Sequence, residues 1–114
     1  MKLVKLIIFL FILFSLTSLK AQDRDFQLNR LFNQLKIKDA ALTNVTEQKI
    51  WEIWSTHPHN KDLTNRLAEG SSLVRNKQLS KAINIFTEVI DLDPKWAEAW
   101  NKRATVFYMI GDYK

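Results

Sequence analysis

Two histidines, His57 and His59, flank Pro58 and are the side chains in this sequence best suited to bind a metal ion. A zinc site needs three or four ligands, and no third ligand lies at an obvious interval from this pair. Two imidazoles beside a proline are also typical of an exposed loop. The sequence therefore favours a solvated loop over a metal centre, and neither a metal nor a cofactor is expected.

Other candidates for catalysis are the adjacent Ser71 and Ser72, and the acids Asp91 and Asp93 beside Pro94. The serines lie within a helical pattern, and acids beside a proline are typical of turns. The chain has no cysteine, no glycine-rich phosphate loop and no histidine with an evident acidic partner. Because the groups needed for nucleophilic or acid–base catalysis are missing, the sequence predicts that the protein is not an enzyme.

Aromatic side chains offer binding chemistry instead, since they are enriched at protein interfaces. The tryptophans are Trp51, Trp54, Trp96 and Trp100. Trp100 is expected to pack within the fold, while Trp51 and Trp54 divide between the core and an exposed face. A partner contact is the alternative for Trp51 or Trp96.

Asn101, Lys102 and Arg103 stand side by side and suggest a carboxylate-binding patch. A solvated helix face is the simpler interpretation. Both interpretations stay open at the level of the sequence.

The spacing of apolar residues predicts five helices joined by short turns. The predicted spans are 25–36, 39–56, 61–76, 80–91 and 96–110. Asn44 and Glu47 could form a capping box, which would move the start of the second helix to a later residue. Pro94 must lie beyond the fourth helix, because it lacks an N–H and its ring clashes with the preceding turn. Gly111 is suited to end the fifth helix in a left-handed conformation.

An internal repeat relates the last three helices at a shift of about 34 residues. At this shift the coinciding pairs are Gly70 with Ala104, Leu73 with Phe107, Leu79 with Tyr113, and Asn60 with Pro94. Small residues thus coincide with small ones, large apolar residues with large apolar ones, and loops with loops.

The first unit of this repeat has the pattern of a helical hairpin, in which small residues on one helix face bulky ones on the other. Gly70 and Ala82 supply the small positions, and Phe86 and Val89 supply the bulk. Ala82 is expected at the tightest contact, facing Gly70 or Leu73.

These residues resemble the tetratricopeptide repeat (TPR) family over 63–114. The matching positions are Gly70, Ala82, Phe86 and Pro94 in the first unit, and Trp100, Ala104, Phe107 and the turn Gly111, Asp112, Tyr113 in the second. The chain departs from the pattern at Arg66, where a bulky aromatic is usual, and at Lys77, where glycine is usual. The resemblance implies an all-α fold of antiparallel helix-hairpin repeats, a TPR-like α-solenoid, here following an N-terminal signal helix.

The resemblance also implies a concave groove lined by the first helix of each unit. Carried onto this sequence, the partner-binding residues are Leu67, Ser71, Val74, Arg75, Asn101, Thr105, Tyr108 and Met109. Their apolar, amide and hydroxyl groups suit an extended peptide or a partner helix. The carboxylate clamp of some family members needs lysine and asparagine where this chain has Leu67 and Ser71, so recognition of a C-terminal carboxylate is not expected.

The N-terminus has the residue order of a secretory signal peptide. Lys2 and Lys5 precede an apolar run over 6–14, and small residues lead to Ala21. This run is shorter than the roughly 20 apolar residues of a bilayer span. Cleavage after Ala21 and export to a bacterial periplasm are therefore expected. The alternative is an uncleaved membrane anchor over 1–20.

Charge and composition fit one small helical domain after the signal peptide. The 114-residue chain has a formal net charge of +5, and three of its lysines lie within the signal, which leaves about +2 for the rest. This balance gives no basic patch for nucleic acid. The predicted organisation is a signal peptide over 1–21, an N-terminal helical pair over 22–60 (a degenerate repeat or cap), a first repeat over 61–96 and the first helix of a truncated second repeat over 97–114.

The sequence thus predicts an exported, non-catalytic TPR adaptor or scaffold that binds a protein or peptide and makes no membrane contact after signal cleavage. The rivals are a membrane-anchored structural subunit of an envelope complex and the non-catalytic front end of a larger enzyme assembly. No partner helix follows 96–110, so the chain is expected to be a C-terminally truncated fragment. The face formed by Trp100, Ala104, Phe107 and Ile110 should lie partly open and allow self-association.

Overall fold

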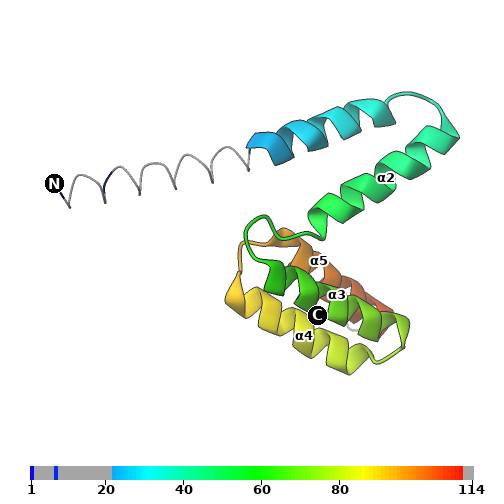
Figure 1. Cartoon of the computed structure of the whole chain (residues 1–114). Helices are drawn as coiled ribbons and strands as arrows, with labels where there is room; N and C mark the ends of the chain where they lie inside the picture. Colours follow the sequence, from blue (N-terminus) through cyan, green and yellow to red (C-terminus); the bar gives the residue numbers. More distant parts are fainter. Residues whose placement is uncertain (2–6, 8–21, 112–114) are drawn as a thin grey trace. The chain divides into compact units, whose positions relative to one another are not determined.

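The structure of the protein, a computed structural model, describes residues 1, 7 and 22–111 (Figure 1). Every regular element in this part of the chain is a helix. The helices are residues 22–35, α2 (Ala40–Trp54), α3 (Lys61–Arg75), α4 (Leu79–Leu92) and α5 (Ala97–Met109). The prediction of an all-α chain with five helices is confirmed, and each helix begins and ends within a few residues of its predicted span. The predicted signal peptide and the residues after Gly111 lie outside the described residues.

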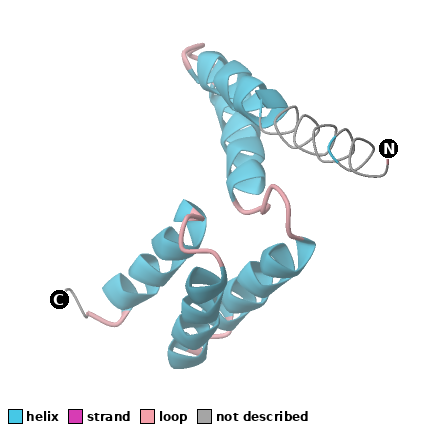
Figure 2. Ribbon diagram, turned by 90° about the vertical axis from the view of Figure 1, so that its left-hand side faces the viewer, coloured by secondary structure: helices cyan, strands magenta, loops and turns pink. Residues whose placement is uncertain are grey.

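The chain divides into two compact units, Met1–Ile53 and Trp54–Lys114. The described part of the first unit contains a hairpin of two antiparallel helices, residues 22–35 and α2 (Figure 2). Its buried side chains are Leu31, Thr46 and Ile50. Arg24 adds a tie across the hairpin, because its Nη2 donates to the Ile53 carbonyl at 3.1 Å.

Asp39 fixes the start of α2. The backbone N–H of Leu42 donates to Asp39 Oδ1 at 3.0 Å, which satisfies one of the unpaired N–H groups at the helix start. Thr43 Oγ1 also donates to the Asp39 carbonyl at 2.7 Å. The capping box predicted at Asn44 and Glu47 is therefore wrong, because both residues lie inside the helix.

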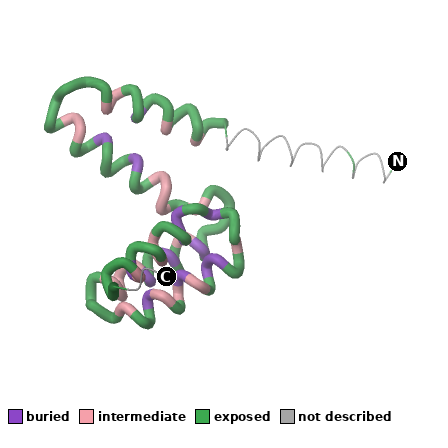
Figure 3. Tube along the Cα trace, turned by 180° about the vertical axis from the view of Figure 1, so that it is seen from behind, coloured by how far each residue is buried: buried purple, intermediate pink, exposed green. Residues whose placement is uncertain are grey.

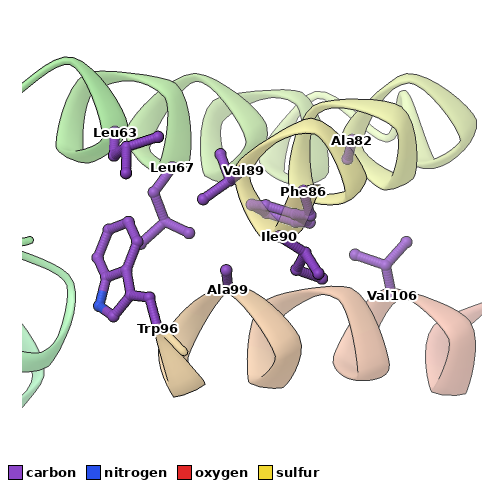
Figure 4. Packing of buried hydrophobic residues seen from close by; sticks show 9 residues of the cluster. All are labelled: Leu63, Leu67, Ala82, Phe86, Val89, Ile90, Trp96, Ala99 and Val106. Atoms are coloured by element: carbon purple, nitrogen blue, oxygen red, sulfur yellow. The ribbon is translucent and has the colours of Figure 1, made fainter. Parts of the chain in front are cut away.

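The second unit packs α3, α4 and α5 side by side, with α4 against both of the others (Figure 1). Buried residues gather where the three helices face one another (Figure 3). The core consists of Leu63, Leu67, Ala82, Phe86, Val89, Ile90, Trp96, Ala99 and Val106 (Figure 4). Burial of a side chain such as Phe86 or Val89 contributes about 1.5–3 kcal/mol, so this cluster is the main source of stability in the unit.

Gly70 lies at a tight contact between α3 and α4. A Cβ atom at this position would overlap the ring of Phe86, which is itself fully buried. The predicted pairing of a small residue with a bulky one is confirmed. However, the ring of Phe86, on the second helix, faces Gly70, whereas Ala82 was expected there.

The helix ends follow local backbone chemistry. α4 ends at Leu92, two residues before Pro94, as predicted. Among the described residues, positive φ angles occur at Lys77 (58°) and Gly111 (78°). These two residues are separated by the repeat shift of about 34. The same left-handed turn therefore ends the first helix of both units, with lysine in one and glycine in the other.

Candidate functional site

A pocket opens between α3 and α5 with a cavity volume of about 220 Å³. Its lining residues are Ser71, Val74 and Arg75 from α3, Phe86 from α4, and Lys102, Thr105 and Val106 from α5. The structure thus brings together four of the predicted partner-binding residues, Ser71, Val74, Arg75 and Thr105. Because α3 and α5 are the first helices of the two repeat units, the pocket lies on the side where the sequence analysis placed the groove.

The floor of this pocket is apolar. Phe86 and Val106 are fully buried, and Val74 is half-buried. Ser71 Oγ donates to the Leu67 carbonyl and Thr105 Oγ1 donates to the Asn101 carbonyl, each at 2.9 Å. Both hydroxyl protons are therefore engaged within their own helices.

On the α5 side of the pocket, the buried carboxylate of Glu98 lies close to Lys102. Glu98 has a side chain only 6% exposed, and its Oε1 lies 3.4 Å from Lys102 Nζ. Asn101 Nδ2 donates to the other oxygen, Oε2, at 3.2 Å. Glu98 also stands in the first turn of α5, where the helix dipole stabilises a negative charge. This pair partly compensates the charge of Lys102.

The other predicted site residues take different positions. Asn101, Tyr108 and Met109 are exposed on α5. Leu67 is 1% exposed and belongs to the core, so its assignment as a groove residue is wrong. Its side chain points into the core, beside Trp96 (Figure 4).

Arg103 does not share a patch with Lys102. Its guanidinium lies over the ring of Trp100, 4.8 Å from the centroid, and its Nη1 donates to Thr87 Oγ1 at 3.2 Å. Trp100 Nε1 in turn donates to the Pro94 carbonyl at 2.9 Å. Trp100 was expected to pack within the fold, but its side chain remains 46% exposed. Its contacts are the hydrogen bond from Nε1 and the ring face that Arg103 covers.

His57 forms a buried polar contact that the sequence analysis missed. Its side chain is 8% exposed, and Nε2 lies 2.7 Å from Asp93 Oδ2. Nδ1 accepts from the backbone N–H groups of His59 and Asn60 at 3.1 and 2.9 Å. The ring packs edge-on against Trp96 at 4.9 Å. The solvated-loop interpretation is therefore wrong for His57, and so is the statement that no histidine has an acidic partner.

The hydrogen bonds of His57 assign its tautomer. Since Nδ1 accepts, Nε2 carries the proton and donates to Asp93. Asp93 Oδ1 also accepts from the Lys95 N–H at 3.0 Å. The hydrogen bond from His57, together with the one from Lys95, holds the pKa of the Asp93 carboxyl below its usual range. With both ring nitrogens engaged, His57 links the loop before α3 to the loop before α5.

Trp96 completes this contact between the two loops. It is buried, and its Nε1 donates to the Trp54 carbonyl at 3.2 Å. One feature of the sequence hints at this cluster. The turn before α5 contains Asp93 and Pro94, and the corresponding turn one repeat earlier contains His57. Only packing identifies that pair, because 36 residues separate His57 from Asp93.

A second, larger pocket of about 450 Å³ lies in the first unit. It is lined by Gln27, Arg30, Leu31, Gln34, Lys49, Glu52 and Ile53. None of these residues was predicted to bind a partner, and most of them are exposed polar side chains.

Within the described residues, no group of three or more acidic or histidine side chains is placed to hold a metal ion. None of the helices in that part of the chain combines the length and the apolar character needed to cross a membrane.

Comparison with known proteins supports the repeat interpretation. The chain is 29% identical over 90 aligned positions to a TPR repeat-containing protein of Rhizobium etli. The alignment covers 77% of this chain and 43% of the relative, so the chain spans less than half of that protein's length. No family model matches the chain, and no solved structure matches it. The helical hairpins, the repeat shift and this similarity together define a TPR-like helical repeat protein, a class with a general role in protein interaction.

Proposed function

We propose that the protein is a non-catalytic interaction module, an adaptor or scaffold that binds a peptide or partner helix in the groove between α3 and α5. The observation that carries this proposal is the pocket between these helices, where a buried apolar floor lies beneath polar and cationic side chains. Small apolar pockets with a few placed polar groups are typical of ligand recognition. Tyr108 and Met109 add exposed, adaptable surface near the C-terminal end of α5.

Site-specific photo-crosslinking tests this proposal. A photoreactive amino acid in place of Thr105 lies in the groove. One in place of Lys81 lies at an exposed position of α4, outside the groove. We expect discrete crosslinked adducts from Thr105 and none from Lys81 in the cells that make the protein. The substitution Ser71→Trp should fill the pocket and remove the Thr105 adducts. Adducts of equal yield from both positions would contradict a groove-specific interaction.

Tyr108 provides a second test, because exposed interface aromatics often cost more than about 2 kcal/mol on truncation. We expect Tyr108→Ala to weaken capture of the crosslinked partner while the helical circular dichroism signal stays unchanged. Parallel loss of helicity and of capture would show that Tyr108 supports the fold, and its assignment to the groove would fail.

We further propose that the protein is exported, with the signal peptide over 1–21 removed after Ala21. The support is the order of charged, apolar and small residues at the N-terminus. Sequencing the N-terminus of the protein isolated from its host tests this point. A mature N-terminus at Gln22 is the expected result, whereas retention of Met1 would favour the membrane-anchored subunit.

Self-association is a further part of the proposal for partners. Trp100, Ala104 and Ile110 are exposed on one side of α5, and Phe107 is half-buried there. Contiguous exposed apolar side chains favour association with another surface.

A further inference from the structure

The pocket between α3 and α5 is sized for a single side chain. Its volume of about 220 Å³ is below the roughly 300–1,000 Å³ of sites that enclose a drug-sized molecule. Phe86, Val106 and Val74 give it an apolar floor. An aliphatic side chain placed there would lose contact with water and gain contact with these three residues.

The hydroxyl groups of Ser71 and Thr105 determine which polar groups of a ligand can form hydrogen bonds in the pocket. Each hydroxyl donates its proton to a carbonyl of its own helix. Their oxygen lone pairs remain available to accept a hydrogen bond. Ser71 on α3 and Thr105 on α5 can therefore each accept a hydrogen bond from a backbone N–H of the ligand.

Arg75 supplies a positive charge that can select an acidic group of the ligand beside the pocket. Of the two cations that line the pocket, Lys102 is paired with Glu98. Arg75 lies in the last turn of α3, and no acidic side chain among the described residues forms an ion pair with it. A guanidinium group binds a carboxylate through two parallel hydrogen bonds.

We propose that this pocket binds an internal peptide segment in which an aliphatic side chain stands next to aspartate or glutamate. The inference rests on the proposed interaction function and names the ligand class of the same groove. The aliphatic side chain covers Phe86 and Val106, a backbone N–H donates to Ser71 or Thr105, and the acidic side chain pairs with Arg75. A free C-terminal carboxylate is not required, because the acidic side chain supplies the negative charge.

Nuclear magnetic resonance titration tests this ligand class, because it detects weak binding and locates it. The probe is a short glycine- and serine-rich peptide, capped at both ends, with one central leucine followed by glutamate. Matched peptides replace the glutamate with glutamine or lysine, or the leucine with asparagine. We expect the leucine–glutamate peptide to shift the amide signals of Ser71, Val74 and Thr105. The glutamine peptide should bind about fivefold more weakly, as expected for an exposed ion pair.

Charge reversal at Arg75 gives the decisive comparison. Arg75→Gln should weaken the glutamate peptide about fivefold, and Arg75→Glu should weaken it further while improving binding of the lysine peptide. Lys81→Gln is the matched control, because it removes one exposed positive charge from α4 outside the pocket. Arg75 is itself exposed, so these variants should keep the helical circular dichroism signal.

The outcomes separate this inference from the proposed function. Equal binding of the glutamate and glutamine peptides, with no effect of Arg75→Gln, would overturn the acidic ligand class while leaving a groove that binds peptides. Absence of any shift at the pocket would also overturn the inference. The crosslinking experiment at Thr105 would then decide the interaction function independently, because it does not depend on the peptide chosen.

Discussion

At the scale of single residues, the ring of Phe86 fills the space beside Gly70 and sets how closely α3 and α4 approach. The core has little freedom to adjust, because Phe86, Val89 and Ala82 are all fully buried. Substitutions at this contact should therefore act through overlap of atoms rather than through helix propensity.

Gly70→Ala should destabilise the protein by about 1–3 kcal/mol, because the new methyl group overlaps the Phe86 ring. Alanine gains up to about 1 kcal/mol in helix propensity over glycine, which does not offset the overlap. Urea denaturation measures the effect.

A double-mutant cycle with Phe86→Leu provides the control for this prediction. The shorter side chain should make Gly70→Ala less harmful than it is in the parent chain, so the two free-energy changes should not add. Additive changes would show that the overlap is relieved elsewhere.

Asp93 gives a residue-scale prediction about pH. Its folded pKa lies below the unfolded value because His57 and the Lys95 N–H donate to the ionised carboxylate. The stabilisation is therefore present above the unfolded pKa, about 4, and is lost as pH falls through the folded value. The difference in unfolding free energy between the parent chain and Asp93→Asn should shrink between about pH 5 and pH 3.

Asp91→Asn is the matched control for this pH dependence. It removes an equal charge from an exposed side chain two residues earlier on α4. An Asp93→Asn difference that stays constant across this pH range would show that the contact with His57 does not stabilise the ionised carboxylate.

At the scale of elements, the turns that follow the first helix of each unit share the same backbone conformation. Lys77 and Gly111 occupy equivalent positions and share a positive φ angle. A side chain in this region costs about 1–2 kcal/mol relative to the right-handed conformation. Glycine avoids most of that cost, which explains why the second unit ends its first helix without strain.

Lys77→Gly should accordingly stabilise the protein by about 0.5–1 kcal/mol, after allowing for the larger conformational entropy of glycine in the unfolded chain. Lys77→Ala removes the same charged side chain without relieving the backbone and should be close to neutral or destabilising. Thermal denaturation distinguishes the two variants. An equal change in melting temperature for both would attribute the effect to the lysine charge instead.

At the scale of the whole molecule, the second unit offers two surfaces on α5. One side lines the pocket through Thr105 and Val106. The other exposes Trp100, Ala104 and Ile110. Substitutions on the two sides should therefore affect different interactions.

The exposed apolar side of α5 should support self-association. Ala104→Glu places a charge at the centre of this side and should weaken association by at least about tenfold, because a charge in an apolar contact loses its hydration. Size-exclusion chromatography with light scattering measures the effect. Asn84→Glu, which adds an equal charge at an exposed position on α4, is the control. A chain that is monomeric at high concentration, with or without the substitution, would contradict this prediction.

Sequence alone determined the helices, because the apolar period of a helix and its end signals depend on neighbouring residues. Pro94 fixed the end of α4, and Gly111 fixed the left-handed end of α5. The small residue at Gly70 was equally visible in the repeat. Because the first helices of the two units share one register, the sequence also indicated that Ser71, Val74, Arg75 and Thr105 lie on the same side, and all four line the pocket.

Tertiary structure alone decided which side chains are covered. Leu67 turns into the core, and Trp100 stays half-exposed at the edge of α5. His57 and Asp93 meet across two loops. Burial depends on which helix covers a position, and the energy of a buried polar contact depends on groups distant in the sequence. Local pattern cannot specify either quantity, because both arise only when α3, α4 and α5 have packed together.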